Sequence, residues 1–202
     1  MTSYAKGENT WNLTEDISSI PKFTAENSPL LEAVYNLSAE EVVKNEFESK
    51  YGTAFYTGEN WKKVWTRDTA MSCEFSLADI LPNIALNCAK EKVVGEKGNE
   101  TFEEDTGSGG SYPVSTDKII TMLSVWEIYL STGDKSVLEY FYPICKNTIK
   151  QDMNVAFDNK SGLFKGETCG TDWRDQTYPD WVSETKENGL QNIADSKCIL
   201  SF

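Results

Sequence analysis

The segment from Asp68 to about Lys92 constrains the fold most, because its apolar side chains cover most of the circumference of a helix. A helix that is apolar on several sides is buried by neighbours on several sides. Pro82 has no backbone N–H and should kink this helix. The segment therefore predicts one long, kinked helix within a larger helical assembly. Its apolar residues are Ala70, Met71, Cys73, Phe75, Leu77, Ala78, Ile80, Leu81, Ile84, Ala85, Leu86 and Cys88.

Helical periodicity and capping residues predict further helices along the chain. Ser28 is placed as an N-cap with Pro29 in the first turn, a favoured helix start. Gly133 is a stop signal, and Asp134 is the N-cap of the helix that follows. The predicted helices span about residues 28–47, 115–131 and 134–157, and another is expected to begin near Asn192.

The remaining chain is polar and rich in turn residues, so the predicted fold class is all-α. Leu163–Glu167 is expected to be a short extended segment. Residues 1–27 are polar and irregular and are expected to form an N-terminal arm anchored by Trp11, leading into a domain over residues 28–202. Four or five helices that are apolar on more than one side leave wide apolar surface. Self-association through those exposed faces is one expected way of covering it.

The charge balance and the absence of histidine narrow the function. The net charge of −13 repels phosphates and anionic lipids, which argues against nucleic acid and membrane partners. The chain has no histidine, so acid–base chemistry near neutral pH falls mainly to Asp and Glu. Gly107–Gly110 lacks the tail of a phosphate loop, and no metal or organic cofactor is implied.

The cysteines and the N-terminus bear on the compartment. The five cysteines include no CxxC pair, and their odd, scattered number favours buried free thiols over a disulfide framework. Met1–Ile20 has no apolar stretch typical of a signal peptide, and no apolar run reaches the roughly 18 residues of a membrane span. A soluble protein is expected, with the cytoplasm favoured over a periplasmic or secreted location that would require a removed signal.

Thr171–Trp181 combines three carboxylates, one guanidinium and three aromatic rings within a short stretch. Aromatic rings stack on the C–H faces of sugars, and charged side chains bind hydroxyls and move protons. A solvated loop that carries surface rings is the alternative interpretation.

A second segment, Trp61–Thr69, places an Arg67–Asp68 pair, preceded by aromatic rings, at the start of the buried helix. Asp68 is either the N-cap of that helix or, with Arg67, a ligand for hydroxyl groups; the two roles are compatible. If helices alternate around a ring, the loops at 53–68, 107–117 and 164–181 lie on one rim.

These two segments resemble motifs of the six-hairpin glycosidases, the (α/α)6-toroid glycoside hydrolases of carbohydrate metabolism. Trp65–Thr69 is similar to the W-x-R-D-T motif of the glucosidase domain of glycogen debranching enzymes. Thr171–Asp175 is similar to the acid-bearing segment of debranching enzymes and trehalases, and α-L-rhamnosidases share the fold. The resemblance covers about residues 53–181 and implies a partial toroid with about five of its twelve helices.

The resemblance implies an inverting hydrolysis of a neutral O-glycosidic bond in an oligosaccharide or glycoside. It carries the general-acid role onto Asp175, with Asp172 as the rival and Glu167 as a third candidate. It implies substrate binding by Trp65, Arg67, Asp68, Trp173 and Arg174.

The sequence departs from the motif at two positions. Asp172 precedes the tryptophan, and Arg174 precedes Asp175. Arg174 would oppose a raised pKa at Asp175 if the two side chains paired, and Asp172 would then be the better acid.

In these families the general base lies in the C-terminal half of the ring. The expectation is therefore a chain without its base, that is, a truncated, inactive fragment. The alternatives are a non-catalytic carbohydrate-binding remnant and a helical interaction scaffold.

Overall fold

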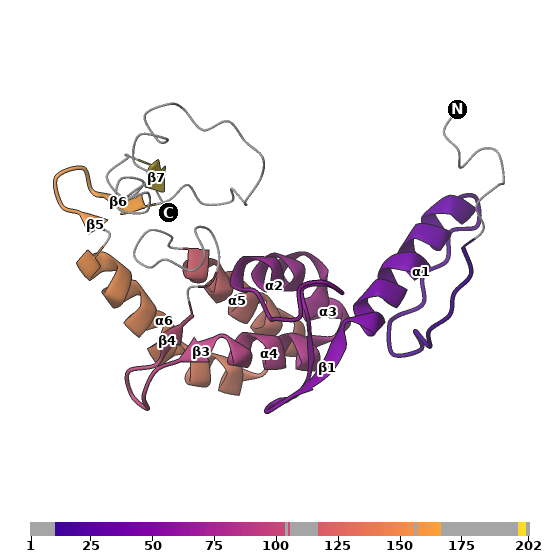
Figure 1. Cartoon of the computed structure of the whole chain (residues 1–202), viewed down its shortest axis with the longest axis horizontal. Coiled ribbons are helices and arrows are strands. Elements are labelled where there is room, and N and C mark those ends of the chain that lie inside the picture. Colours follow the sequence, from indigo (N-terminus) through magenta and orange to yellow (C-terminus); the bar gives the residue numbers. More distant parts are fainter. Residues whose placement is uncertain (1–10, 104, 106–116, 156, 167–197, 201–202) are drawn as a thin grey trace.

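A computed structural model describes residues 11–103, 105, 117–155, 157–166 and 198–200 of this chain. The described part is mostly helical and carries three small antiparallel sheets. Helices α2 to α6 form the body of the molecule, α1 extends from one end of it, and β5–β7 lie beyond the opposite end (Figure 1). The predicted helical class therefore holds, with hairpins added between and after the helices.

Helix α1 (Pro29–Lys44) begins where the sequence predicts, with Ser28 as its N-cap and Pro29 as its first residue. The Ser28 side chain makes no capping hydrogen bond, so the start depends on the fixed φ of proline. The helix ends at Lys44, short of the predicted Phe47. Three of its apolar residues, Leu30, Leu31 and Val34, are half or more exposed.

Phe47 belongs instead to a β-hairpin of β1 (Glu46–Ser49) and β2 (Gly52–Phe55), in which it pairs with Ala54. Gly52 has a φ of +107°, a backbone conformation that L side chains rarely adopt and that closes the turn. The hairpin packs on α4, where the Asn87 side chain donates to the Thr53 carbonyl at 2.9 Å.

The prediction of one continuous helix over residues 68–92 is wrong. The segment forms α2 (Thr66–Ser72), a π-helical turn (Cys73–Leu77), α3 (Ala78–Ile80) and α4 (Pro82–Glu91). Leu81 leaves the helical conformation, with φ −138° and ψ 60°. The residue before a proline is disfavoured in the α region, so Pro82 starts a new helix rather than kinking an old one.

The next two helices form a hairpin whose turn was predicted correctly. A 3₁₀ turn (Asp117–Ile120) leads into α5 (Thr121–Thr132), and α6 (Lys135–Val155) follows. Gly133 adopts the left-handed conformation with φ +65°, and its N–H donates to the Tyr129 carbonyl at 2.8 Å. Asp134 caps α6 by accepting a hydrogen bond from the Ser136 N–H at 2.9 Å.

Helix α5 packs against α2, α4 and α6, and the main core lies among these helices. The aromatic centre of that core is Phe102 beside Phe141, with ring centroids 5.9 Å apart. The buried residues of this core are Cys73, Ala78, Ala85, Ala89, Phe102, Val125, Ile128, Val137, Phe141 and Ile144. A smaller core beneath the β1–β2 hairpin consists of Ala54, Phe55, Val64 and Cys88.

The remaining strands are short. They are β3 (Val93–Val94) paired with β4 (Thr101–Phe102), and β5 (Phe157–Asp158), β6 (Leu163–Gly166) and β7 (Cys198–Leu200) in one sheet. The predicted extended segment near 163 is thus confirmed. The helix predicted from Asn192 begins outside the described residues, but Cys198–Leu200 form a strand against β6, so that prediction is wrong there.

In the part of the chain that is described, none of the helices combines the length and the apolar character needed to cross a membrane.

Candidate functional site

The structure describes three of the seven predicted site residues. Trp65, Arg67 and Asp68 lie at the beginning of α2. The proposed acids Asp175 and Asp172, the neighbouring Trp173 and Arg174, and the third candidate Glu167 all lie outside the described residues. Their predicted convergence with Arg67 and Asp68 on one rim stays a prediction.

The start of α2 excludes one of the two predicted roles of Asp68, that of the N-cap. Trp65 is the N-cap residue, and it makes no side-chain capping bond. Asp68 lies one turn further in and is exposed, where a carboxylate is favoured by the positive end of the helix dipole. Asp68 is therefore not the N-cap, which leaves the ligand-binding role as the prediction for this residue.

Asp105, from a distant segment, caps the helix instead. Its Oδ1 accepts a hydrogen bond from the Thr66 backbone N–H at 3.0 Å, and the Thr66 hydroxyl donates to the Glu103 carbonyl at 3.0 Å. Thr66 is fully buried. The first turn of α2 is thereby tied to the segment that follows β4.

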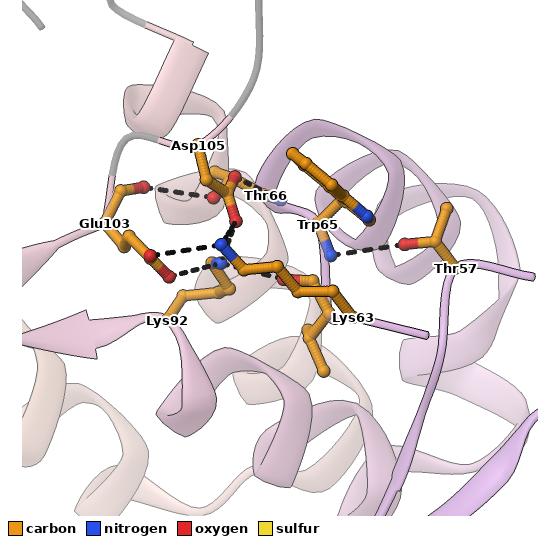
Figure 2. A network of polar contacts seen from close by, with 8 residues as sticks. Thr57, Lys63, Trp65, Thr66, Lys92, Glu103 and Asp105 are labelled. Carbon is orange, nitrogen blue, oxygen red and sulfur yellow. Dashed lines mark hydrogen bonds and ion pairs between the residues drawn. The ribbon is translucent and has the colours of Figure 1, made fainter. Parts of the chain in front are cut away.

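Lys92, directly after α4, lies at the centre of this arrangement (Figure 2). Its Nζ pairs with Asp105 Oδ2, lies 2.8 Å from Glu103 Oε2 and donates to the Val64 carbonyl at 2.8 Å. A lysine ammonium has three protons, and three acceptors surround it. The buried charge is therefore both paired and hydrogen-bonded, as burial of an ion requires.

Lys63 adds a second cation on the outer side of the same carboxylates. Its Nζ lies 3.1 Å from Asp105 Oδ2 and 3.2 Å from Glu103 Oε1. The same Nζ lies 5.1 Å from the centroid of the Trp65 ring, within the range of a cation–π contact. The backbone N–H of Trp65 donates to the Thr57 hydroxyl at 3.2 Å, which further fixes this stretch of backbone.

Two lysines and two carboxylates balance each other's charge in this network. Burial by itself would raise the pKa of Asp105, but the Lys92 ammonium and the Thr66 hydrogen bonds outweigh it and hold that pKa below its usual value. Burial would lower the pKa of Lys63, and its bonds to Asp105 and Glu103 reverse this and raise it. Both groups are therefore held in their charged forms.

We call the set Lys63, Thr66, Lys92, Glu103 and Asp105 the ion clamp. It fixes the backbone from Lys63 to Thr66, and with it the point from which Trp65, Arg67 and Asp68 project. Sequence reasoning missed the clamp. A lysine at the end of an otherwise apolar helical segment was the one available signal, and nothing local marks Glu103 or Asp105 as its partners.

The described cysteines behave as predicted. Cys73 and Cys88 are buried free thiols, and Cys145 is partly buried. Burial raises the pKa of Cys73 strongly and raises the pKa of Cys88 and of Cys145 to about 11. Because the thiolate is the reactive form, these three thiols are poor nucleophiles near neutral pH. Within the described ranges, no three acidic or cysteine side chains gather as a metal site.

Comparison with protein-family models, with curated proteins and with solved structures gives no match for this chain.

Proposed function

We propose that this chain carries part of an (α/α)6-toroid glycoside hydrolase domain that acts on a neutral glycoside. The observation that carries the proposal is the start of α2, where the ion clamp orients the segment Trp65–Asp68. An aromatic ring, a guanidinium and an exposed carboxylate next to one another suit the recognition of a sugar.

The packing of the helices supports the toroid. Between α5 and α6 lies an open apolar cavity of about 520 Å³, and Trp126 and Tyr142 on its wall are strongly exposed. An apolar surface of this kind is what neighbouring helix pairs of a toroid would cover. Its lining residues are Met122, Val125, Trp126, Leu138, Glu139, Tyr142 and Cys145.

In the proposed reaction Asp175 protonates the leaving oxygen, while Arg67 and Asp68 hold the hydroxyls of the sugar beside the cleaved bond. A neighbouring tryptophan ring such as that of Trp173 raises a carboxyl pKa by desolvation, which keeps the acid protonated near neutral pH. Inversion also requires a second carboxylate that activates water from the opposite face of the sugar.

The test uses the 202-residue chain with a panel of methyl glycosides, whose leaving oxygen must be protonated. The proposal expects release of the free reducing sugar from at least one member. Asp175→Asn should lower turnover by about 10²–10⁴-fold, the usual contribution of a general acid. Asp68→Asn should weaken binding by about tenfold or more, because a hydrogen bond to a charged group is lost.

Glu96→Gln is the matched control, because Glu96 is an exposed acid in the turn between β3 and β4. If Asp175→Asn is as active as this control while Asp172→Asn is inactive, the acid is Asp172. Absence of both hydrolysis and saccharide binding would overturn the proposal.

The exposed α5–α6 cavity also favours a second candidate, a helical interaction scaffold. It predicts concentration-dependent self-association of the chain, measured by sedimentation velocity, which Trp126→Ser would weaken. Saccharide binding without turnover would instead support a non-catalytic carbohydrate-binding protein.

A further inference from the structure

Helix α1 carries an apolar stripe that the rest of the described chain leaves uncovered. Leu30, Leu31 and Val34 are half or more exposed. Val34 follows the two leucines by four and three residues, the spacings at which side chains are neighbours on a helix surface. Among the described residues of α1, Val42 alone packs on a core of the body, and the helix projects from the end of that body (Figure 1). The stripe is therefore open to a partner.

The N-terminal arm covers a different side of α1. The Tyr35 hydroxyl donates to the Pro21 carbonyl, and the Thr14 N–H donates to Glu40 at 2.8 Å. Most of the stability of a helix in a protein comes from the packing of its apolar face. The arm contacts polar groups of α1 and leaves the apolar stripe exposed, so packing on that stripe would stabilise the helix further.

The α5–α6 cavity has the complementary shape, because it is an apolar hollow of about 520 Å³. Trp126 of α5 and Tyr142 of α6 form part of its wall and are strongly exposed. Glu139 is the one charged residue among those that line it. A helix that lays its apolar face into a hydrophobic groove is a recurring mode of protein recognition.

The charges beside the two apolar surfaces are also complementary. Lys135 and Lys146 are exposed and flank the cavity on α6, three residues before and four residues after residues of its lining. They outnumber the single acid of the lining, Glu139. On α1, the exposed Glu41 follows Val34 by two helical turns and continues the stripe. An acid along one surface and lysines beside the other favour contact between the two surfaces over contact of α1 with another α1.

We propose that α1 of one copy of this chain lies in the α5–α6 cavity of a second copy, with its apolar stripe against Trp126 and Tyr142. Each copy carries both surfaces, so exchange in both directions makes the contact twice and closes a two-fold dimer. This inference rests on the second candidate function, the interaction scaffold, and names its partner. It does not depend on the proposed hydrolysis.

Sedimentation velocity over a concentration series tests the contact. Salt at about 0.15 M gives a Debye length of roughly 8 Å, which screens the repulsion between two chains of net charge −13. The α1 variant carries Leu30→Gln and Val34→Gln, and the cavity variant carries Trp126→Ser and Tyr142→Ser. All four residues are exposed, so folding should be retained, which far-UV circular dichroism checks.

Each variant alone should associate about tenfold or more weakly than the unmodified chain, because anchor residues of the interface are lost. An equimolar mixture of the two should form dimers again, because the intact α1 of the cavity variant meets the intact cavity of the α1 variant. The restored dimer makes the contact once, so it should be weaker than the unmodified dimer. Phe75→Ser is the matched control, because Phe75 is strongly exposed outside both surfaces, and it should leave association unchanged.

The other outcomes identify other contacts. Loss of association in the cavity variant but not in the α1 variant would overturn the inference and leave the scaffold candidate standing. Loss in the α1 variant alone would mean that α1 pairs with α1, which also contradicts the inference. It fails as well if the mixture associates no better than its components. A chain that is monomeric at every concentration would remove both the inference and the scaffold candidate.

Discussion

Asp105 accepts a hydrogen bond from the backbone N–H of Thr66 at 3.0 Å, so a carboxylate 39 residues away caps the first turn of α2. The same carboxylate pairs with the ammonium of Lys92, which is buried after α4. One side chain therefore joins a helix start, a helix end and the segment after β4. Three segments that carry the candidate site depend on it.

Asp105→Asn tests the charge in this cap. The variant retains an oxygen that can accept from Thr66, but it loses the charge that faces Lys92 and Lys63. We expect the free energy of unfolding to fall by about 3–5 kcal/mol, because a buried ammonium is left partly unpaired. Urea denaturation followed by far-UV circular dichroism measures it. A loss no larger than that of the exposed control Glu96→Gln would contradict this role.

The two lysines of the clamp offer a matched comparison. Lys92 is 2% exposed at its side chain, whereas Lys63 is 43% exposed, and both contact Glu103 and Asp105. Lys92→Met should cost about 3–5 kcal/mol, because a buried pair is broken. Lys63→Met should cost about 1 kcal/mol or less, because water screens exposed pairs. Equal urea midpoints for the two variants would show that burial does not govern the clamp.

The N-terminal arm should detach from α1 in acid. Glu40 is buried and accepts hydrogen bonds from the Thr14 N–H at 2.8 Å and from the Trp11 indole N–H at 2.9 Å. The Thr14 hydrogen bonds, with smaller contributions from Trp11 and Lys44, lower the pKa of Glu40 from 4.5 to about 2. Because the pKa is lowered in the folded chain, the stabilisation that the Glu40 carboxylate gives to the folded state is complete above pH 4.5 and is lost as the pH falls towards 2.

The measurement is the indole N–H signal of Trp11, followed by NMR as the pH is lowered from about 6 to about 2, the range in which the Glu40 carboxylate takes up a proton. The signal is assigned by its absence from the spectrum of Trp11→Phe. We expect it to move to a solvent-exposed position within that window. Glu40→Gln should show the detached signal at neutral pH. A Trp11 signal that stays constant down to the lowest pH would rule out this anchor.

Gly133 ends α5 with φ +65°, a conformation that costs an L residue about 1–2 kcal/mol. A Cβ added at Gly133 meets no atom within 4 Å, so the backbone alone is responsible for the cost. Gly133→Ala should lower the free energy of unfolding by about 1 kcal/mol. Gly58→Ala is the control, because its Cβ meets only Trp61, at an ordinary 3.9 Å. Similar melting temperatures for the two variants would contradict the assignment of strain to Gly133.

Much of the helical layout could be predicted because its signals are local. Pro29 starts α1, Gly133 ends α5 and Asp134 caps α6, and each acts on its own backbone or on a neighbour within a few residues. The break at Pro82 was partly predicted. The sequence marks the position, but whether proline bends a helix or begins a new one depends on what packs around it.

The β1–β2 hairpin shows where local patterns mislead. Phe47 fits a helical spacing with the apolar residues before it. In the structure it lies in β1, where it pairs with Ala54 of β2 and stacks on Tyr56. Contacts with α4 override the local preference, as tertiary context does for short elements.

By itself the sequence determined the helical class and the helix ends marked by Pro29, Gly133 and Asp134, because each follows from the chemistry of one residue or its near neighbours. The tertiary structure alone decided that Asp105 caps α2 and that Lys92 is a buried partner and not a surface charge. Those facts depend on groups far apart in the chain meeting where water is excluded. There, an ion pair has a much larger energetic weight than it has in solvent.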